Sequence, residues 1–192
     1  MSFKIQTLNK IAAVGLNVLD RDNYEIASEI NNPDAILVRS AEMHDMQLSA
    51  NVKAVARAGA GTNNIPIPEL TEKGVVVFNT PGANANAVKE LVMLALLLSS
   101  RPVIDANKWA NALAGKGDEI PALAEKGKSQ FVGPELMGKT LGIIGLGAIG
   151  AMVANLALHF GMEVIGYDPF LSVKSALFLD KKVKIAETLD TV

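Results

Sequence analysis

The sequence predicts an α/β fold made of two units, each built around a parallel β-sheet. Residues 1–80 contain short runs rich in Val, Ile and Ala that alternate with helical or turn stretches. A second strand–helix–strand series follows Gly138, after a long apolar helical stretch. Strands that alternate with helices in this way pair in parallel and are covered by helices on both faces.

The first series is expected to supply five strands. Each run is bounded by Gly, Pro, Asn or Asp, which is typical of short strands that end in turns. The expected strands cover residues 3–7, 24–27, 35–39, 52–58 and 75–79. A helix is expected over 67–73, because Gly74 stands where a glycine commonly ends a helix.

A long helix is expected over 84–101, with Pro102 near its end. It carries two apolar stripes, one of Val88, Leu91, Val92, Ala95 and Leu96 and one of Leu94, Leu97 and Leu98. A helix that is apolar on two sides is buried between layers or at a subunit contact. Its apolar run is far too short to span a bilayer.

A second helical stretch over 103–113 carries Trp109, which we interpret as a packing residue. Residues 114–133 are rich in Gly and Lys and predict a surface connection, with a short helix near 122–126.

The most informative segment is a glycine motif between a strand over 140–144 and a helix over 151–160. Gly145 permits a tight turn, Gly147 allows a pyrophosphate to approach the backbone, and Gly150 allows close packing of helix on strand. The next strand, over 163–167, ends at Asp168, whose carboxylate can accept hydrogen bonds from ribose hydroxyls.

This spacing predicts a dinucleotide site whose phosphates meet the N–H groups at the helix N-terminus. A glycine-rich turn without a ligand would leave the placement of Asp168 unexplained. Asp168 also favours NAD over NADP, because a carboxylate repels a 2′-phosphate and its neighbours supply no cation. A poorer helix over 172–179 and a strand over 182–186 follow, so only the first half of a six-stranded dinucleotide domain is expected.

A second group of candidate residues follows the strands of the first series. Arg39 and Ser40 follow one strand, Arg57 and the glycine loop Gly59-Ala60-Gly61 follow another, and Asn79 follows a third. Ligands of α/β sheets bind at the carboxyl ends of the strands, and Arg suits carboxylates and phosphates. These residues predict an anion pocket. Taken singly, the arginines could instead be surface ion-pair partners and Asn79 a turn residue.

Composition narrows the function further. The net charge is −2 and no basic run is present, so neither nucleic acid nor an anionic membrane is favoured as a partner. The chain has no cysteine, which excludes thiolate chemistry and favours a reducing cytoplasm. No metal-ligand spacing is present. Of the two histidines, His159 is expected to favour a helix dipole and His44 lies in a loop without an expected partner.

Together these motifs resemble the D-isomer-specific 2-hydroxyacid dehydrogenases, and most closely the branch that oxidises 3-phosphoglycerate. The motifs that carry the resemblance are VRS at 38–40, RAGAGTNNI at 57–65, VFNTPG at 77–82, GKTLGIIGLGAIG at 138–150 and GYDP at 166–169. The resemblance covers essentially the whole chain. One departure is Ala148, which is often Arg in relatives, so that one phosphate contact is missing.

The resemblance implies NAD-dependent oxidation of 3-phosphoglycerate to 3-phosphohydroxypyruvate in serine biosynthesis. It implies a flavodoxin-like substrate domain over 1–98 and the first half of an NAD-binding Rossmann domain over 99–192. Substrate contacts would come from Arg39, Ser40, Arg57, Gly59, Ala60, Gly61 and Asn79. Cofactor contacts would come from Gly145, Gly147, Ala148, Ile149, Gly150 and Asp168.

The resemblance also implies that the family's catalytic Arg, Glu and His have no counterpart in these residues. We therefore expect the chain alone to be inactive, and to associate into homo-oligomers through exposed apolar surface. Two alternatives remain open: a dehydrogenase of another D-2-hydroxy acid, and a non-catalytic NAD-binding module.

Overall fold

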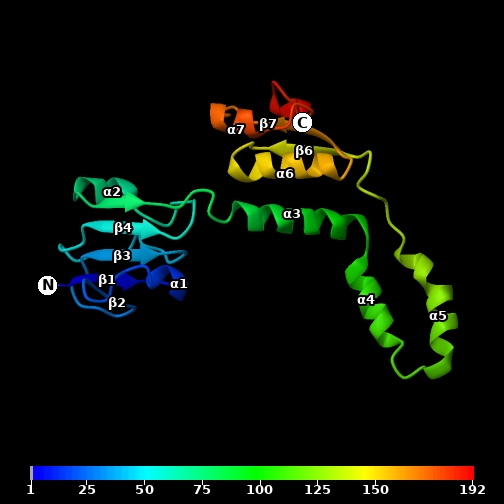
Figure 1. Cartoon of the computed structure of the whole chain (residues 1–192), viewed down its shortest axis with the longest axis horizontal. Coiled ribbons are helices and arrows are strands. Elements are labelled where there is room, and N and C mark those ends of the chain that lie inside the picture. The colour runs from blue at the N-terminus through cyan, green and yellow to red at the C-terminus, as the bar shows by residue number, and fades with distance from the viewer. Residues whose placement is uncertain (1) are drawn as a thin grey trace. The chain divides into compact units, whose positions relative to one another are not determined.

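The computed structural model describes residues 2–192 and divides into two compact units, Met1–Asn84 and Ala85–Val192 (Figure 1). Each unit contains one parallel β-sheet, which confirms the predicted α/β class with two parallel-sheet units. Among the helices of residues 2–192, none combines the length and the hydrophobicity of a membrane-spanning segment.

The first unit is a five-stranded sheet in the order β2-β1-β3-β4-β5, with every neighbouring pair parallel. Two helices accompany it, α1 (Ala13–Leu16) and α2 (Ile67–Glu72). The strands are β1 (Phe3–Thr7), β2 (Tyr24–Ala27), β3 (Ala35–Val38), β4 (Ala54–Arg57) and β5 (Val76–Phe78). All five lie within a residue or two of the predicted ranges.

The core of the first unit lies around the central strands β3 and β4. Ile36, Val38 and Val55 of these strands are buried, together with Met43 and Leu70 from the connections that cover them. A strand with neighbours on both edges and cover on its faces excludes water, so its residues are mostly apolar. This core fixes the strand ends from which the candidate anion pocket extends.

The second unit contains a three-stranded sheet in the order β6-β7-β8, with strands Thr140–Ile144, Glu163–Tyr167 and Lys184–Ile185. Helix α6 (Ala148–His159) joins β6 to β7, and α7 (Val173–Phe178) joins β7 to β8. Helix α6 begins three residues before the predicted start at 151, because Gly150 fits within its first turn. Ala154, Ala157 and Val164 are buried between this helix and the sheet.

Helix α3 (Ala85–Ser100) packs along α6 of the second unit. Its Met93 is buried, whereas Leu91, Leu94 and Leu97 are 64%, 50% and 40% exposed. The exposed leucines thus include Leu91 of the first predicted stripe and Leu94 and Leu97 of the second, while the side of the helix that carries Met93 is covered. The compact units divide before α3, whereas the functional division after residue 98 stays a prediction.

The predicted surface connection over 114–133 is mostly helical, which corrects the expectation of a single short helix. It contains a 3₁₀ turn (Gly117–Glu119), α5 (Ile120–Gly127) and a second 3₁₀ turn (Lys128–Phe131). These lie beside α4 (Val103–Ala112) because the Trp109 ring packs on Phe131 with centroids 5.2 Å apart. Trp109 is thus a packing residue, as predicted.

Candidate functional site

The sequence-predicted anion residues lie at one edge of the first sheet. Strands β3, β4 and β5 are adjacent and parallel, so their carboxyl ends at Val38, Arg57 and Phe78 meet. Arg39 and Ser40 follow the first of these ends and Asn79 follows the last. The structure therefore brings the predicted residues to a common edge, where parallel sheets hold their ligands.

The Arg57 guanidinium contacts the backbone at this edge of the sheet. Its Nε donates to the carbonyl oxygen of Arg39 at 3.0 Å. Its Nη1 fills the space beside two glycines, since a Cβ built on Gly59 or Gly61 would lie 2.9 or 3.2 Å from that atom. Larger residues at 59 or 61 would displace the guanidinium, so these glycines give Arg57 its place.

Asn79 and Thr80 tie the next strand end to the same loop. Asn79 Nδ2 donates to the carbonyl oxygen of Ala60 at 2.8 Å, and the Thr80 amide donates to Gly59 at 2.9 Å. Thr80 Oγ1 also donates to the carbonyl oxygen of Arg57 at 3.3 Å. The loop over 59–61 is thus held by the Asn79 side chain and the Thr80 amide, which follow β5.

A cavity of about 320 Å³ opens beside this loop. Its lining includes two of the sequence-predicted residues, Arg39 and Gly59, and is completed by Ala58, Thr80, Ala83 and Asn84. No acidic side chain pairs with Arg39 or Arg57 among residues 2–192. The cavity therefore has an exposed guanidinium whose charge is not neutralised, which is what an anionic ligand requires.

Asn84 was not singled out from the sequence. It lies in the turn after Gly82, five residues beyond Asn79, and its amide offers both a donor and an acceptor to the cavity. The repeated Asn in the stretch 79–86 was the available signal. The sequence alone cannot show which of these asparagines lines a cavity.

The second unit carries the predicted dinucleotide loop between β6 and α6. Gly145 has φ +93°, a conformation that side chains rarely adopt. A Cβ on Gly150 would lie 1.9 Å from the carbonyl oxygen of Gly145, so only glycine allows this approach of helix and turn. A Cβ on Gly147 would meet nothing within 4 Å, which leaves open space over the loop.

Asp168 follows β7 and folds back onto this loop. Its Oδ2 accepts from the Leu146 amide and its Oδ1 accepts from the Phe170 amide, both at 2.8 Å. The carboxylate is thus oriented toward the glycine turn, and each oxygen keeps a further lone pair for a hydroxyl. Ala148 and Ile149 form the first turn of α6, and Ile149 lines a cavity of about 370 Å³ beside Gly145 and Gly150.

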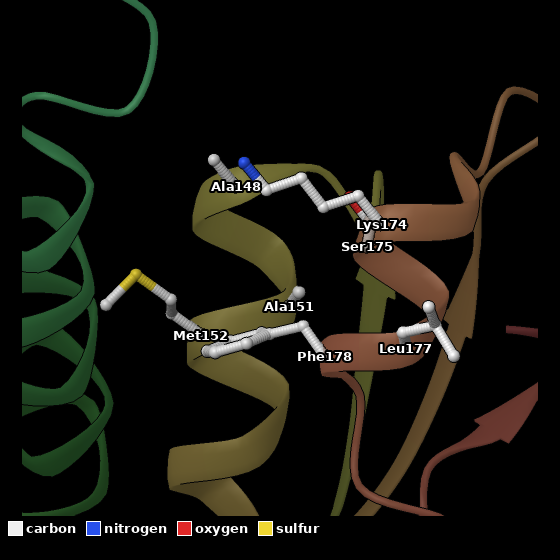
Figure 2. Close-up of a pocket in the computed structure, with 7 residues that line it drawn as sticks. All are labelled: Ala148, Ala151, Met152, Lys174, Ser175, Leu177 and Phe178. Carbon is white, nitrogen blue, oxygen red and sulfur yellow. The ribbon is translucent and has the colours of Figure 1, made fainter.

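A further cavity, of about 450 Å³, lies between α6 and α7 (Figure 2). Its lining is mainly apolar and includes Met152, Leu177 and Phe178. The Lys174 side chain extends toward Ala148 at the start of α6. Ala148 is the only predicted cofactor residue in this lining, so cavity size alone does not mark the dinucleotide site.

The histidines fall outside both sites. His159 ends α6, where its Nδ1 contacts the Asn155 carbonyl oxygen, as expected for a residue at a helix C-terminus. His44 was expected to lack a partner, and this was wrong: its Nδ1 contacts Glu42 Oε1. The side-chain hydrogen bond raises the pKa of His44 and lowers the pKa of Glu42.

The His44–Glu42 pair was missed because the two residues belong to an irregular loop, where spacing gives no geometry. Neither residue lines the cavity beside Arg39. Within residues 2–192, no group of His, Cys, Asp and Glu side chains is arranged to hold a metal ion.

Comparison with known proteins identifies the family to which the chain is similar. The family described as "D-isomer specific 2-hydroxyacid dehydrogenase, catalytic domain" matches residues 4–188. The chain is 32% identical over 186 residues to D-3-phosphoglycerate dehydrogenase of Synechocystis, which covers 90% of this chain and 32% of the relative. It is 40% identical over 154 residues to hydroxypyruvate reductase of Thermotoga maritima, covering 79% and 46%.

Solved structures are similar throughout the chain. The NAD⁺-bound 3-phosphoglycerate dehydrogenase of Entamoeba histolytica matches with a TM-score of 0.69 and 25% identity, over 100% of this chain and 59% of that one. A D-isomer specific 2-hydroxyacid dehydrogenase from Polaromonas shares the fold with a TM-score of 0.73. The chain spans 32% and 46% of the lengths of the two curated relatives named above. The chain belongs to the D-isomer specific 2-hydroxyacid dehydrogenase family.

Proposed function

We propose that this chain serves NAD-dependent oxidation of a D-2-hydroxy acid, with 3-phosphoglycerate as substrate and 3-phosphohydroxypyruvate as product, in serine biosynthesis. The observation that carries the proposal is that each unit has one sheet edge suited to an anion. The edge of the first unit presents Arg39 to a cavity. The edge of the second presents an open glycine turn at the start of α6.

The residues of the second unit fit NAD. Open space over Gly147 suits a pyrophosphate, and the free N–H groups at the start of α6 suit its charge. Asp168 is placed at the end of β7, where its carboxylate can accept from both hydroxyls of an adenosine ribose. The bound cofactor supplies hydride acceptance, while the residues of this chain bind and orient it.

The residues of the first unit fit a small acid with a second anionic group. The Arg39 guanidinium can hold a carboxylate or a phosphate, and Asn84 can bond a hydroxyl. Oxidation breaks the C–H bond at carbon 2 as a hydride transfer to the nicotinamide and releases the hydroxyl proton to a base. Phosphoglycerate dehydrogenases among the relatives support the phosphorylated substrate. The 40% identity with a hydroxypyruvate reductase supports a related hydroxy acid as the second candidate.

We propose that the chain alone binds these ligands but does not turn them over. The proton needs a base, and the side chains that line the cavity beside Arg39 include no histidine or carboxylate. The proposal therefore places the acid/base outside the residues that line this cavity.

The test is calorimetry on the chain with NAD, 3-phosphoglycerate, D-glycerate and D-lactate, followed by an assay for NADH formation. The expected order of affinity is 3-phosphoglycerate, then D-glycerate, then D-lactate, with NAD binding and no NADH. Tighter binding of D-lactate would favour another hydroxy acid. Binding of NAD without any hydroxy acid would favour a non-catalytic NAD-binding module, and NADH formation near an ordinary enzyme rate of about 10 per second would contradict the proposed inactivity.

A further inference from the structure

One side chain outside the predicted site controls the turn that carries Arg39. Asn9 follows β1, and its Oδ1 accepts from the amides of Arg39, Ser40 and Ala41 at 2.9, 2.9 and 3.0 Å. Asn9 reaches this position because the pairing of β1 with β3 continues past the strand, with the Leu8 amide donating to the Leu37 carbonyl oxygen at 3.0 Å. Three successive amides thus converge on one oxygen.

The same turn is held on its carbonyl side. Arg57 Nε donates to the Arg39 carbonyl oxygen at 3.0 Å, and Asn64 Nδ2 donates to the Ala41 carbonyl oxygen at 2.7 Å. Asn64 is 6% exposed, and its backbone carbonyl accepts from the Met43 amide at 3.0 Å. The backbone from Arg39 to Ala41 is thus bonded through its amides to Asn9 and through its carbonyls to Arg57 and Asn64.

The chemistry of residue 9 matters as well as its geometry. An apolar side chain there would leave three amides without their protein partner, and the Ala41 amide is partly buried, so that its loss is the most costly. A carboxylate could accept the same three bonds but would add a negative charge beside Arg39 and Arg57. A carboxamide gives the acceptor without a charge that competes with an anionic ligand.

We infer that Asn9 is a positioning residue for substrate binding: it fixes the Arg39–Ala41 turn while leaving the positive charge of Arg39 free for the substrate anion. This inference rests on the proposed function of the Arg39 cavity. Asn9 itself does not line that cavity, so its effect passes through the turn.

The test compares Asn9→Leu and Asn9→Asp with wild type and with the control Asn17→Leu. Asn17 is exposed in the same unit and its side chain makes no hydrogen bond within residues 2–192. Amide hydrogen exchange of residues 39–41 reports the turn, and titration with 3-phosphoglycerate followed by NMR reports ligand binding.

Asn9→Leu is expected to speed exchange of the three amides at least tenfold and to weaken 3-phosphoglycerate binding at least tenfold. Asn9→Asp is expected to keep the protection of the amides yet weaken binding several-fold, a loss that a purely structural role would not produce. Asn17→Leu should match wild type in both. Unchanged exchange in Asn9→Leu, or unchanged binding in Asn9→Asp, would overturn the inference.

The two proposals can fail separately. If wild type does not bind 3-phosphoglycerate while Asn9→Leu still exposes the amides, the substrate proposal fails and the Asn9 inference is reduced to folding, which also overturns its functional part. If wild type binds and Asn9→Leu binds equally well, only the Asn9 inference fails.

Discussion

Arg57 Nε donates to the carbonyl oxygen of Arg39 at 3.0 Å, although the two arginines were expected to play the same part. Arg39 lines the cavity and Arg57 does not. Arg39 therefore faces the cavity, while Arg57 bonds the Arg39 backbone and fills the space beside Gly59 and Gly61. Mutation of Arg39 and mutation of Arg57 should therefore have different effects on stability.

Arg39→Ala is expected to lower affinity for 3-phosphoglycerate about tenfold to a hundredfold and to leave NAD affinity unchanged. A hydrogen bond to a charged group contributes about 1.5–3 kcal/mol, and about 1.4 kcal/mol corresponds to tenfold. Arg39→Lys should recover only part of the loss, because an ammonium lacks the fork of a guanidinium. Calorimetry with each ligand measures this, and equal losses for both ligands would contradict a substrate role.

Arg57→Ala is expected to lower both thermal stability and 3-phosphoglycerate affinity, because the Arg39 turn and the glycine loop lose their common support. The comparison with Arg39→Ala is decisive, since the latter removes an exposed side chain and should keep the melting temperature of wild type. Thermal unfolding of both variants measures the difference. Equal melting temperatures for the two variants would show that Arg57 supports nothing.

Two glycines of the dinucleotide loop provide a matched pair. Gly150→Ala is expected to destabilise the second unit by about 1–3 kcal/mol, the cost of overpacking, because its Cβ would lie 1.9 Å from the Gly145 carbonyl oxygen. Gly147→Ala should fold as wild type, since its φ is −69° and its Cβ meets nothing. It should nevertheless lose NAD affinity, because the methyl group occupies the space meant for the pyrophosphate. Unchanged NAD binding by Gly147→Ala would place the cofactor elsewhere.

Asp168→Ser is expected to reduce the preference for NAD over NADP by about 1–3 kcal/mol, the scale of a lost hydrogen bond to a charged group. The structure adds a control, because Asp168 also accepts from the Leu146 and Phe170 amides. Asp168→Asn keeps one of the two acceptor oxygens, which can still bond the Leu146 amide, and removes the charge that repels a 2′-phosphate. Binding constants for both cofactors measure the ratio, and a ratio equal to that of wild type in both variants would rule out the ribose contact.

The His44–Glu42 pair predicts a pH-dependent contribution to stability. The raised pKa of His44 gives stabilisation that is present at low pH and is lost as pH rises through that pKa. The lowered pKa of Glu42 gives stabilisation that is lost as pH falls through its own pKa. The pair therefore stabilises the fold at pH values between the pKa of Glu42 and the pKa of His44. NMR titration of His44 should show its pKa return toward the ordinary value in Glu42→Gln, and an identical titration in both proteins would exclude the pair.

Much of the fold follows from local pattern. The strands Thr140–Ile144 and Glu163–Tyr167 match their predicted ranges because an apolar run bounded by glycines or an acid leaves little choice. The helix over 120–127 was underestimated because its stability comes from packing near Trp109, which the sequence of the connection does not reveal.

The residues at the strand ends could be predicted from the sequence, but the hydrogen bonds between them could not. Arg39, Arg57 and the glycines could be found because strand ends in a parallel sheet converge. The contacts of Asn9 join residues 30 to 32 positions apart through side-chain bonds, which no periodicity encodes. Arg39 leaves its predicted strand for the same reason, because its amide bonds to Asn9 instead of a neighbouring strand.

The central claim is that each unit holds its own ligand. NMR spectra of the isotope-labelled 192-residue chain, titrated separately with NAD and with 3-phosphoglycerate, test it most directly. We predict that NAD shifts the amides of Gly145, Gly147 and Asp168 and leaves Arg39 and Gly59 unmoved, while 3-phosphoglycerate does the reverse. Both ligands shifting the same residues, or neither shifting any of these, would contradict the account.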